Sequence, residues 1–302
     1  MIPDRSHIHT EQRNPESDEL DRLSTLEAVL LMNRADQQAV AAVASQSAQI
    51  AIAVDFAAAA LASGGRLIYV GAGTSGRLGV LDAAECPPTF SLEPGRVVGI
   101  IAGGPAALTA SIENVEDEAA RGQRAILDQQ TGPDDVVVGI AAGGTTPFVH
   151  GAIAQARRSG AKTIFLACTD RCHISAEADL YICLPTGPEV ITGSTRLKAG
   201  TATKLVLNTI STLAMVKLGK VFGNLMVDLD ASKNTKLRDR AARIIHQITG
   251  LERNAALDLL EVAGGNVKRG LVMHVRGVTS HEADKILAAA RGRLAAIIAA
   301  KT

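Results

Sequence analysis

The sequence of 302 residues contains no tryptophan, and its aromatic content is only 2%. Aromatic side chains are the platforms on which proteins stack single-stranded nucleic acids, so this shortage argues against such a partner. An excess of either charge is also missing, because 31 Lys and Arg balance 31 Asp and Glu. Since nucleic-acid-binding proteins usually carry a basic surface patch, we expect no nucleic-acid partner.

Long apolar runs and a cysteine framework are missing as well. The longest apolar run, residues 50–62, is interrupted by Asp55 and is shorter than the roughly 20 residues that a membrane-spanning helix needs. Residues 1–14 are polar and contain no apolar core of a secretory signal. The four cysteines are too few and too scattered for a disulfide scaffold. We therefore expect a cytoplasmic protein with no membrane partner.

The sequence does contain a regular alternation of strand and helix patterns. Short β-branched runs predict buried strands at residues 66–70, 97–102, 135–142, 163–168 and 180–184. Helical patterns cover residues 17–33, 35–63, 106–129 and 198–218, and further helices follow the glycines at 76 and 144. This alternation predicts an α/β fold, in which a parallel sheet has helices on both faces.

The two ends of the chain differ from this middle part. Residues 1–16 form a polar arm that is either disordered or strapped onto the body. Beyond residue 234 no strand pattern remains, and short helices are expected at residues 237–248, 252–263, 266–275 and 280–299. We predict an N-terminal arm with helices over residues 1–58, an α/β ligand-binding domain over 59–222 and a small all-helical C-terminal domain over 223–302.

The loop after the first predicted strand is a candidate anion site. Gly73, Thr74, Ser75 and Gly76 offer bare amides and hydroxyls at the start of a helix, where anions bind favourably. The glycines match G-x-G-x-x-G, but the next predicted strand does not end in the acid that a dinucleotide site needs. A monophosphate ester therefore suits the loop better. A plain strand-to-helix turn would use the same glycines, so the spacing alone leaves that alternative open.

Two further segments offer similar groups. Residues 137–146 repeat the order of strand, small residues and hydroxyls, and end in Thr145 and Thr146. Loops at the carboxyl ends of parallel strands converge, so the two glycine loops are expected to grip one polar ligand from two sides. The third segment precedes a long predicted helix and supplies Ser194, Thr195, Arg196 and Lys198. Its two cations suit phosphate or sugar oxygens, although an ordinary helix cap with exposed cations would look the same.

Two acidic segments are candidates for proton transfer. Glu85 stands between Ala84 and Cys86 and before a double proline, and apolar neighbours would desolvate its carboxyl group and favour a proton donor. Glu113 and Glu116 are three residues apart in a predicted helix, so they would share one face and one of them can point inward. Each segment also fits a solvated surface.

Metal ligands are sparse in the sequence. Cys168, Cys172 and His173 have no second pair of ligands near them. His7 and His9 lie in the polar N-terminal arm, where we expect them to be solvated. We therefore expect no metal site.

Longer segments around these candidates resemble one enzyme family. Residues 71–79 (GAGTSGRLG) together with 82–89 (DAAECPPT) are similar to the signature of N-acetylmuramic acid 6-phosphate etherases. Residues 23–27, 192–208 and 219–228 resemble the same family, so the similarity covers nearly the whole chain. Three positions depart from the family pattern: Gly143 and Thr145 stand where serine and arginine are usual, and Asn114 stands where glycine is usual.

The resemblance implies a sugar-isomerase (SIS) domain with a flavodoxin-like parallel sheet, followed by a small all-helical domain. It implies a cytoplasmic homodimer without metal or organic cofactor. It further implies a lyase that cleaves the D-lactyl ether of N-acetylmuramic acid 6-phosphate in peptidoglycan recycling, giving N-acetylglucosamine 6-phosphate and D-lactate. The two functional glutamates of the family carry over to Glu85 and Glu116, with the phosphosugar at the hydroxyl-rich loops.

Such a reaction needs two carboxyl groups in different protonation states. One removes the C2 proton of the open-chain sugar, and the other protonates the departing lactate oxygen. We assign the acid to Glu85 and the base to Glu116, and the reverse assignment stays open. Two other functions remain as alternatives: a SIS-type phosphosugar isomerase, and a non-catalytic phosphosugar-binding regulator similar to glucokinase regulatory protein.

Overall fold

The computed structural model describes residues 6–229, 231 and 235–298. The chain forms two compact units, which we describe separately. The first comprises Met1–Ala84 and Gly95–Ser211, and the second comprises Glu85–Pro94 and Thr212–Thr302. The domain boundaries expected at residues 58/59 and 222/223 remain predictions.

The first unit is built on a five-stranded parallel sheet in the order β2-β1-β3-β4-β5. The strands are β1 Leu67–Gly71, β2 Val97–Ile101, β3 Val136–Ile140, β4 Lys162–Ala167 and β5 Leu180–Cys183. All five match the predicted strands. The register pairs Gly71 with both Ile101 and Ile140, so the loops after β1, β2 and β3 leave the sheet at the same level. The order of the strands reverses at β1 and β3, which is where ligands bind in open α/β sheets.

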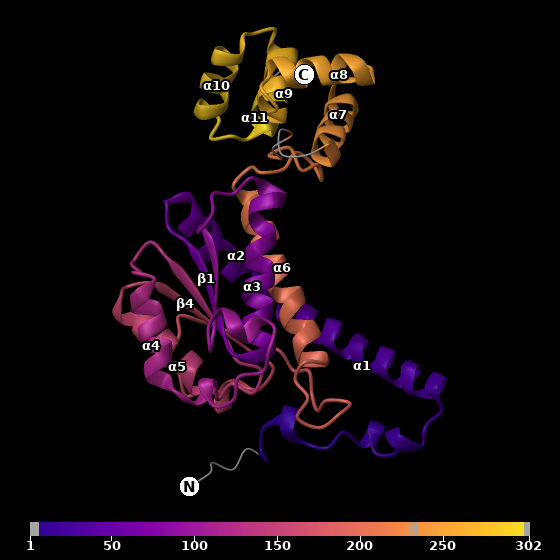
Figure 1. The fold of residues 1–302 in the computed structure, drawn as a ribbon, viewed down its shortest axis with the longest axis vertical. Helices are drawn as coiled ribbons and strands as arrows, with labels where there is room; N and C mark the ends of the chain where they lie inside the picture. The colour runs from indigo at the N-terminus through magenta and orange to yellow at the C-terminus, as the bar shows by residue number, and fades with distance from the viewer. Residues whose placement is uncertain (1–5, 230, 232–234, 299–302) are drawn as a thin grey trace. The chain divides into compact units, whose positions relative to one another are not determined.

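Helices cover both faces of this sheet, as predicted (Figure 1). Their bounds are α1 Thr25–Ser45, α2 Ser47–Ala62, α3 Gly73–Phe90, α4 Ala119–Asp128, α5 Pro147–Arg158 and α6 Lys198–Lys217. Alternate residues of β1 serve the two faces: Ile68 and Val70 pack in the core beneath α4 and α5, whereas the Tyr69 side chain faces α3. Such two-sided burial explains why the strands are continuously apolar.

The N-terminal segments depart from the predicted helices. Residues 17–33 are not one helix, because short 3-10 turns at Pro15–Ser17 and Leu20–Arg22 precede α1. Ser24 and Glu27 form a capping box, which starts α1 at Thr25. The break expected near Arg34 occurs instead at Gln46. Residues 6–16 are strapped onto the unit, since Ile8 and Thr10 are buried.

One other local expectation is corrected, and one helix end is unusual. Helix α3 continues through the double proline, Pro87 and Pro88, to Phe90. Residues 106–129 are not one helix: only Ala119–Asp128 is α-helical, after 3-10 turns at Pro105–Leu108 and Val115–Asp117. Asn114 contributes to the break, because its φ of 63° is left-handed. Asparagine tolerates this conformation better than most residues, and it is the one that glycine adopts freely.

The second unit is helical and contains α7 Thr235–Thr249, α8 Arg253–Val262, α9 Val267–Arg276, α10 Ser280–Ala289 and α11 Leu294–Ile298. The predicted helix over 280–299 divides because Arg291 and Gly292 both take positive φ. Leu260, Leu271 and Val272 are in its apolar core. Half-buried Asp228 is paired with Lys220 at 2.6 Å and Lys268 at 3.2 Å.

Among the described residues, no single helix is both long and apolar enough to cross a membrane. Helices α1 and α2 meet that test only as a pair, and the pair is bent by 65°.

Candidate functional site

A cavity of about 280 Å³ opens at the carboxyl edge of the sheet in the first unit. Three loops form most of its wall, and they follow β1, β2 and β3. The N-terminal arm and the loop before α6 complete it. The lining residues are Ile8, Glu11, Ala72, Gly73, Thr74, Ser75, Arg77, Ala102, Ala107, Ser111, Ile112, Glu113, Val115, Glu116, Ala142, Gly143, Thr145, Thr146 and Thr195.

The first turn of α3 faces this cavity with Gly73, Thr74 and Ser75. The first amides of a helix lack partners within the helix and carry its positive dipole end, so they attract an anion. Gly76 does not line the cavity, but the absence of a side chain at this position allows close packing. A Cβ there would lie 2.6 Å from Ile101 Cγ1 and 2.7 Å from the Gly71 carbonyl oxygen, so only glycine lets the helix start this close to the sheet.

The second glycine loop contributes Gly143, Thr145 and Thr146. Thr146 is the N-cap of α5 and Pro147 follows at its first position, where the missing N–H costs nothing. His150 Nε2 lies 2.7 Å from the Gly144 carbonyl oxygen, which ties the loop to its own helix. The two loops therefore aim two helix N-termini at one cavity, as the internal repeat in the sequence led us to expect.

Carboxylates line the other side of the cavity. Glu116 is half-buried, and Glu113 is exposed and accepts a hydrogen bond from Ser111 Oγ at 3.1 Å. Both stand in the loop after β2 and not on a helix face as predicted. Val115 between them is only 9% exposed and fastens this loop to the apolar core.

Arg77 supplies a cation beside the anion-attracting turn of α3. Its Nε donates to the Leu108 carbonyl oxygen at 3.2 Å and its Nη2 to that of Ala110 at 2.9 Å. Arg77 therefore also holds the loop that carries the two glutamates. The arrangement gives the cavity a positive end near α3 and an acidic end near Glu116.

Glu85 is not among the residues that line the cavity. It follows on α3, about 15 Å further along the helix than Ser75 at 1.5 Å per residue, and it is exposed. The expected desolvation by its neighbours is wrong for this chain. Successive residues of a helix point about 100° apart, so Cys86 is buried while Ala84 and Glu85 face outward.

Asp82, one turn before Glu85, anchors α3. Its Oδ2 accepts a hydrogen bond from Tyr69 Oη at 2.9 Å, and its Oδ1 accepts from Asn208 Nδ2 at 2.6 Å and from Ser211 Oγ at 3.0 Å. These partners lie on β1 and α6. A buried carboxylate with three donors therefore fixes the helix that carries Glu85.

The segment before α6 divides into two groups. Thr195 lines the cavity, while Ser194 and the exposed Arg196 do not. Lys198 is 1% exposed and donates from Nζ to Gln38 Oε1 of α1 at 2.9 Å. Burial lowers the pKa of Lys198, and burial also raises the pKa of Glu189, which accepts from two backbone amides at the start of α6. Lys198 thus contacts α1 and not the cavity.

Some lining residues were missed by reasoning from the sequence. Arg77 could have been predicted, because it is a cation that directly follows the glycine loop proposed as an anion site. Ile8 and Glu11 reach the cavity because the arm folds back over it, and no local pattern announces that contact. Ser111 carries no sequence signal either.

Comparison with known proteins covers both units. Models of the glucokinase regulatory protein N-terminal SIS domain and of the SIS domain match residues 49–157 and 116–213. The chain is 56% identical over 297 residues to an N-acetylmuramic acid 6-phosphate etherase from Nostoc punctiforme, covering 98% of this chain and 96% of that protein. It is 58% identical over 273 residues to the one from Gloeobacter violaceus, covering 90% and 89%. A solved phosphoheptose isomerase from Neisseria gonorrhoeae is 17% identical with a TM-score of 0.47, covering 65% and 97%.

Proposed function

The chain belongs to the N-acetylmuramic acid 6-phosphate etherase family, and we propose that it cleaves the D-lactyl ether of N-acetylmuramic acid 6-phosphate in cell-wall recycling. The products are N-acetylglucosamine 6-phosphate and D-lactate. The reaction is an elimination followed by hydration, so the chain is a carbon–oxygen lyase.

One observation carries this proposal within the first unit. The N-terminal turn of α3, with Thr74 and Ser75, faces the same 280 Å³ cavity as the carboxylate of Glu116. Helix amides and hydroxyls suit the phosphate, and a carboxylate suits abstraction of a proton α to a carbonyl. We assign the phosphate to Gly73, Thr74, Ser75, Thr145 and Thr146, with Thr195 beside them.

In the proposed mechanism Glu116 takes the C2 proton of the open-chain sugar. The electron pair forms the C2–C3 double bond while the C3–oxygen bond breaks, and Glu85 gives its proton to the departing lactate oxygen. Water then adds at C3, losing a proton to Glu85, and C2 regains a proton from Glu116. Both carboxyl groups return to their starting states, so no cofactor is consumed. The assignment of Glu85 rests on the family resemblance alone, because its side chain does not line the cavity that Glu116 faces.

Glu85→Gln and Glu116→Gln test these roles. Each should lower D-lactate release from N-acetylmuramic acid 6-phosphate by about 10²–10⁴-fold, because a general acid or base contributes that much. Glu113→Gln is the matched control, since Glu113 lines the same cavity but has no assigned role. Near-normal release by either of the first two variants would exclude this mechanism.

The same assay separates the alternatives. A phosphosugar isomerase would convert a substrate without a lactyl group and release no lactate. A phosphosugar-binding regulator would bind the substrate with no turnover at all. The matched relatives are etherases, which favours lactate release.

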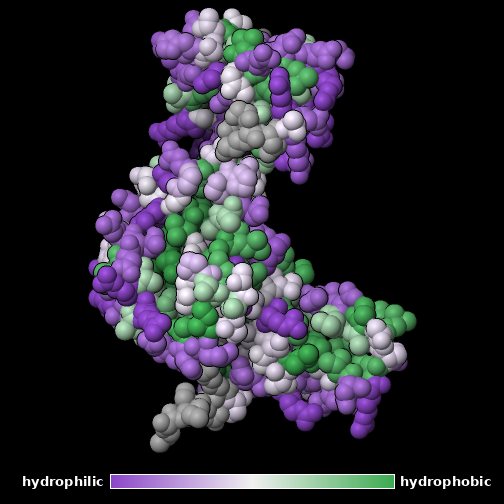
Figure 2. Space-filling view, in the orientation of Figure 1, coloured by the Kyte–Doolittle hydropathy of each residue, from purple (hydrophilic) through white to green (hydrophobic). Residues whose placement is uncertain are grey.

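We further propose a cytoplasmic homodimer that is joined through α1. This helix of 21 residues buries only Leu31, Ala35, Ala39 and Ala42 within the chain. Leu26 is 68% exposed, and Val29, Leu30 and Val40 are exposed too, so hydrophobic surface covers the outer part of α1 (Figure 2). A second copy can cover such a stripe with the same stripe, as a two-fold interface requires.

The variant Leu26→Glu/Leu30→Glu should halve the mass measured by light scattering, because charges on the stripe would be buried by the partner. Val262→Glu is the control, since Val262 is 69% exposed but lies in the second unit. An unchanged mass for the α1 variant would reject this interface.

A further inference from the structure

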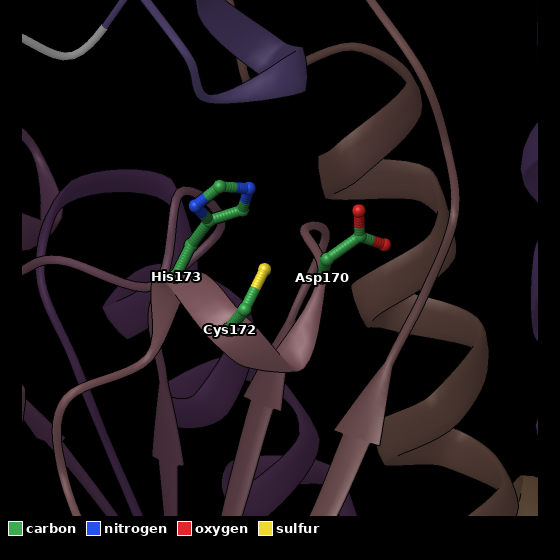
Figure 3. Close-up of side chains that lie close together, drawn as sticks. All are labelled: Asp170, Cys172 and His173. Atoms are coloured by element: carbon green, nitrogen blue, oxygen red, sulfur yellow. The ribbon is translucent and has the colours of Figure 1, made fainter.

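A second group of chemically active side chains gathers outside the cavity. Asp170, Cys172 and His173 follow β4, and their ligand atoms all lie within 4.8 Å of one another. Figure 3 shows the three side chains pointing to the same side, away from the strand ends. We call these residues, together with His9, the His–Cys cluster.

The N-terminal arm supplies the fourth member of the cluster. His9 Nε2 lies 3.8 Å from Asp170 Oδ2. The ring of His7 lies over that of His173, with centroids 4.9 Å apart. The sequence suggests that Cys172-His173 lacks a second pair of ligands, but the fold brings the arm to it. We expected the arm histidines to be solvated, and the His9 side chain is 38% exposed while it also contacts this loop.

The geometry points to a Zn²⁺ site made by Asp170, Cys172, His173 and His9, and we propose that Zn²⁺ binds there. Zinc takes four ligands in a tetrahedron at about 2.0–2.3 Å, which sets its ligand atoms about 3.3–3.8 Å apart. The ligand atoms of Asp170, Cys172 and His173 would have to close by about 1.0–1.5 Å. The His9 ring lies 3.8 Å from Asp170 Oδ2 through Nε2, and its centroid is 6.4 Å from that of His173, so the arm would have to move further toward the loop. One thiolate, two imidazoles and one carboxylate form a donor set that prefers zinc to calcium or magnesium. On binding, Cys172 releases its thiol proton to solvent.

Such a site would fasten the arm that forms one wall of the cavity. Ile8 lies between the two arm histidines, is 1% exposed and lines the cavity, as does Glu11 three residues later. Zinc would thus join the arm to the loop after β4 without touching the phosphosugar. In this proposal the metal has a structural role and takes no part in the proposed lyase chemistry. The zinc site can therefore be tested independently of the lyase activity.

The test uses the full chain without a histidine tag. Equilibrium dialysis against Zn²⁺ should give one ion per chain with a Kd below about 1 μM. Co²⁺ in place of Zn²⁺ should produce a thiolate-to-cobalt charge-transfer band in the near ultraviolet. Cys172→Ser should abolish the band, and His9→Ala should weaken Zn²⁺ binding at least about tenfold. Both side chains lie at or near the surface, so neither change should disturb folding.

His281→Ala is the matched control, because it removes an exposed histidine from the second unit. It should leave both the affinity and the cobalt band unchanged. Zn²⁺ should also slow tryptic cleavage after the exposed Arg13 at least about threefold in the unmodified chain, and not in His9→Ala. Absence of binding, or equal binding by Cys172→Ser and the unmodified chain, would overturn the proposal and leave a cluster held only by its own polar contacts.

Discussion

The carboxylates at the two ends of the parallel strands have opposite surroundings. We call the end where the strands begin the amino edge of the sheet, and the end where they finish its carboxyl edge. At the amino edge, Asp135 accepts from Arg66 at 2.7 Å and from the Gly132 amide at 3.0 Å. At the same edge, Asp179 accepts from the amide and the hydroxyl of Thr163, both at 2.8 Å. At the carboxyl edge, Glu116 and Glu113 face the cavity, and the cation Arg77 there binds backbone carbonyls and not these carboxylates.

This difference separates stability from function. Fully partnered carboxylates join β1 to β3 and β4 to β5 where the strands begin. Where the strands end, Glu113 and Glu116 have no cation partner among the described residues, although Glu113 accepts from Ser111 Oγ. Together with the bare helix amides, they leave hydrogen-bonding capacity for a ligand. Changes at the amino edge should therefore alter unfolding, and changes at the carboxyl edge should alter turnover.

Asp135→Asn gives the largest expected effect on stability. It leaves the Arg66 guanidinium, whose side chain is only 25% exposed, without its counter-charge. The free energy of unfolding should fall by about 3 kcal/mol, at the lower end of the range for breaking a buried ion pair. Both tyrosines of the chain, Tyr69 and Tyr181, are in the first unit, so tyrosine fluorescence in urea reports its unfolding.

The neighbouring Asp134 is exposed and provides the control. Asp134→Asn should change the free energy of unfolding by no more than about 0.5 kcal/mol. Equal losses for the two variants would remove the distinction between the two edges, as would a large loss of lactate release at full stability in Asp135→Asn.

The second-largest effect is expected from a fall in pH, which should lower the free energy of unfolding by protonating the carboxylates at the amino edge. Burial alone would raise the pKa of Asp135, but hydrogen bonds and charge from Arg66 outweigh it and lower that pKa. Burial would likewise raise the pKa of Asp179, and the bonds from Thr163 lower it. The stabilisation is fully present above the unfolded-state pKa of about 3.9 and is lost as pH falls through the folded values.

Each of these carboxylates adds a slope of at most about 1.4 kcal/mol per pH unit to the free energy of unfolding. Urea unfolding measured from pH 6 to pH 2.5 should show this decline. The double variant Asp135→Asn/Asp179→Asn should start lower and decline less steeply. A curve as steep as that of the unmodified chain would show that other carboxylates cause the acid sensitivity.

Arg77→Ala should have the smallest effect of the three and should act at the carboxyl edge. Losing both carbonyl contacts frees the loop of Glu116 and removes the cation beside α3. We expect KM for N-acetylmuramic acid 6-phosphate to rise about tenfold, since a bond to a charged group contributes about 1.5 kcal/mol. The exposed Arg121 pairs with Glu118, and Arg121→Ala should leave KM unchanged. If Arg77→Ala lowered the free energy of unfolding without changing KM, Arg77 would stabilise the fold and have no part in substrate binding.

Much of the secondary structure and one wall of the cavity could be predicted from the sequence. The five strands and the short C-terminal helices follow from apolar runs and periodicity, which depend on neighbours a few residues apart. Gly73, Thr74 and Ser75 were predicted to face a common site, and they line the cavity. The helix expected over 106–129 was wrong over residues 106–118, where Asn114 is left-handed and Glu118 is extended, and it forms only from Ala119.

The sequence by itself determined the parallel sheet, the two glycine loops, and a family resemblance that covers both units. Only the tertiary structure decided which side chains meet: Ile8 and Glu11 at the cavity, His9 with Asp170, and Lys198 with Gln38 of α1. It also turned Glu85 outward on α3. The physical reason is the sequence separation between the residues that interact. Strand and helix patterns arise from local sterics and alternation, whereas contacts across more than a hundred residues depend on how the packed chain closes its long loops.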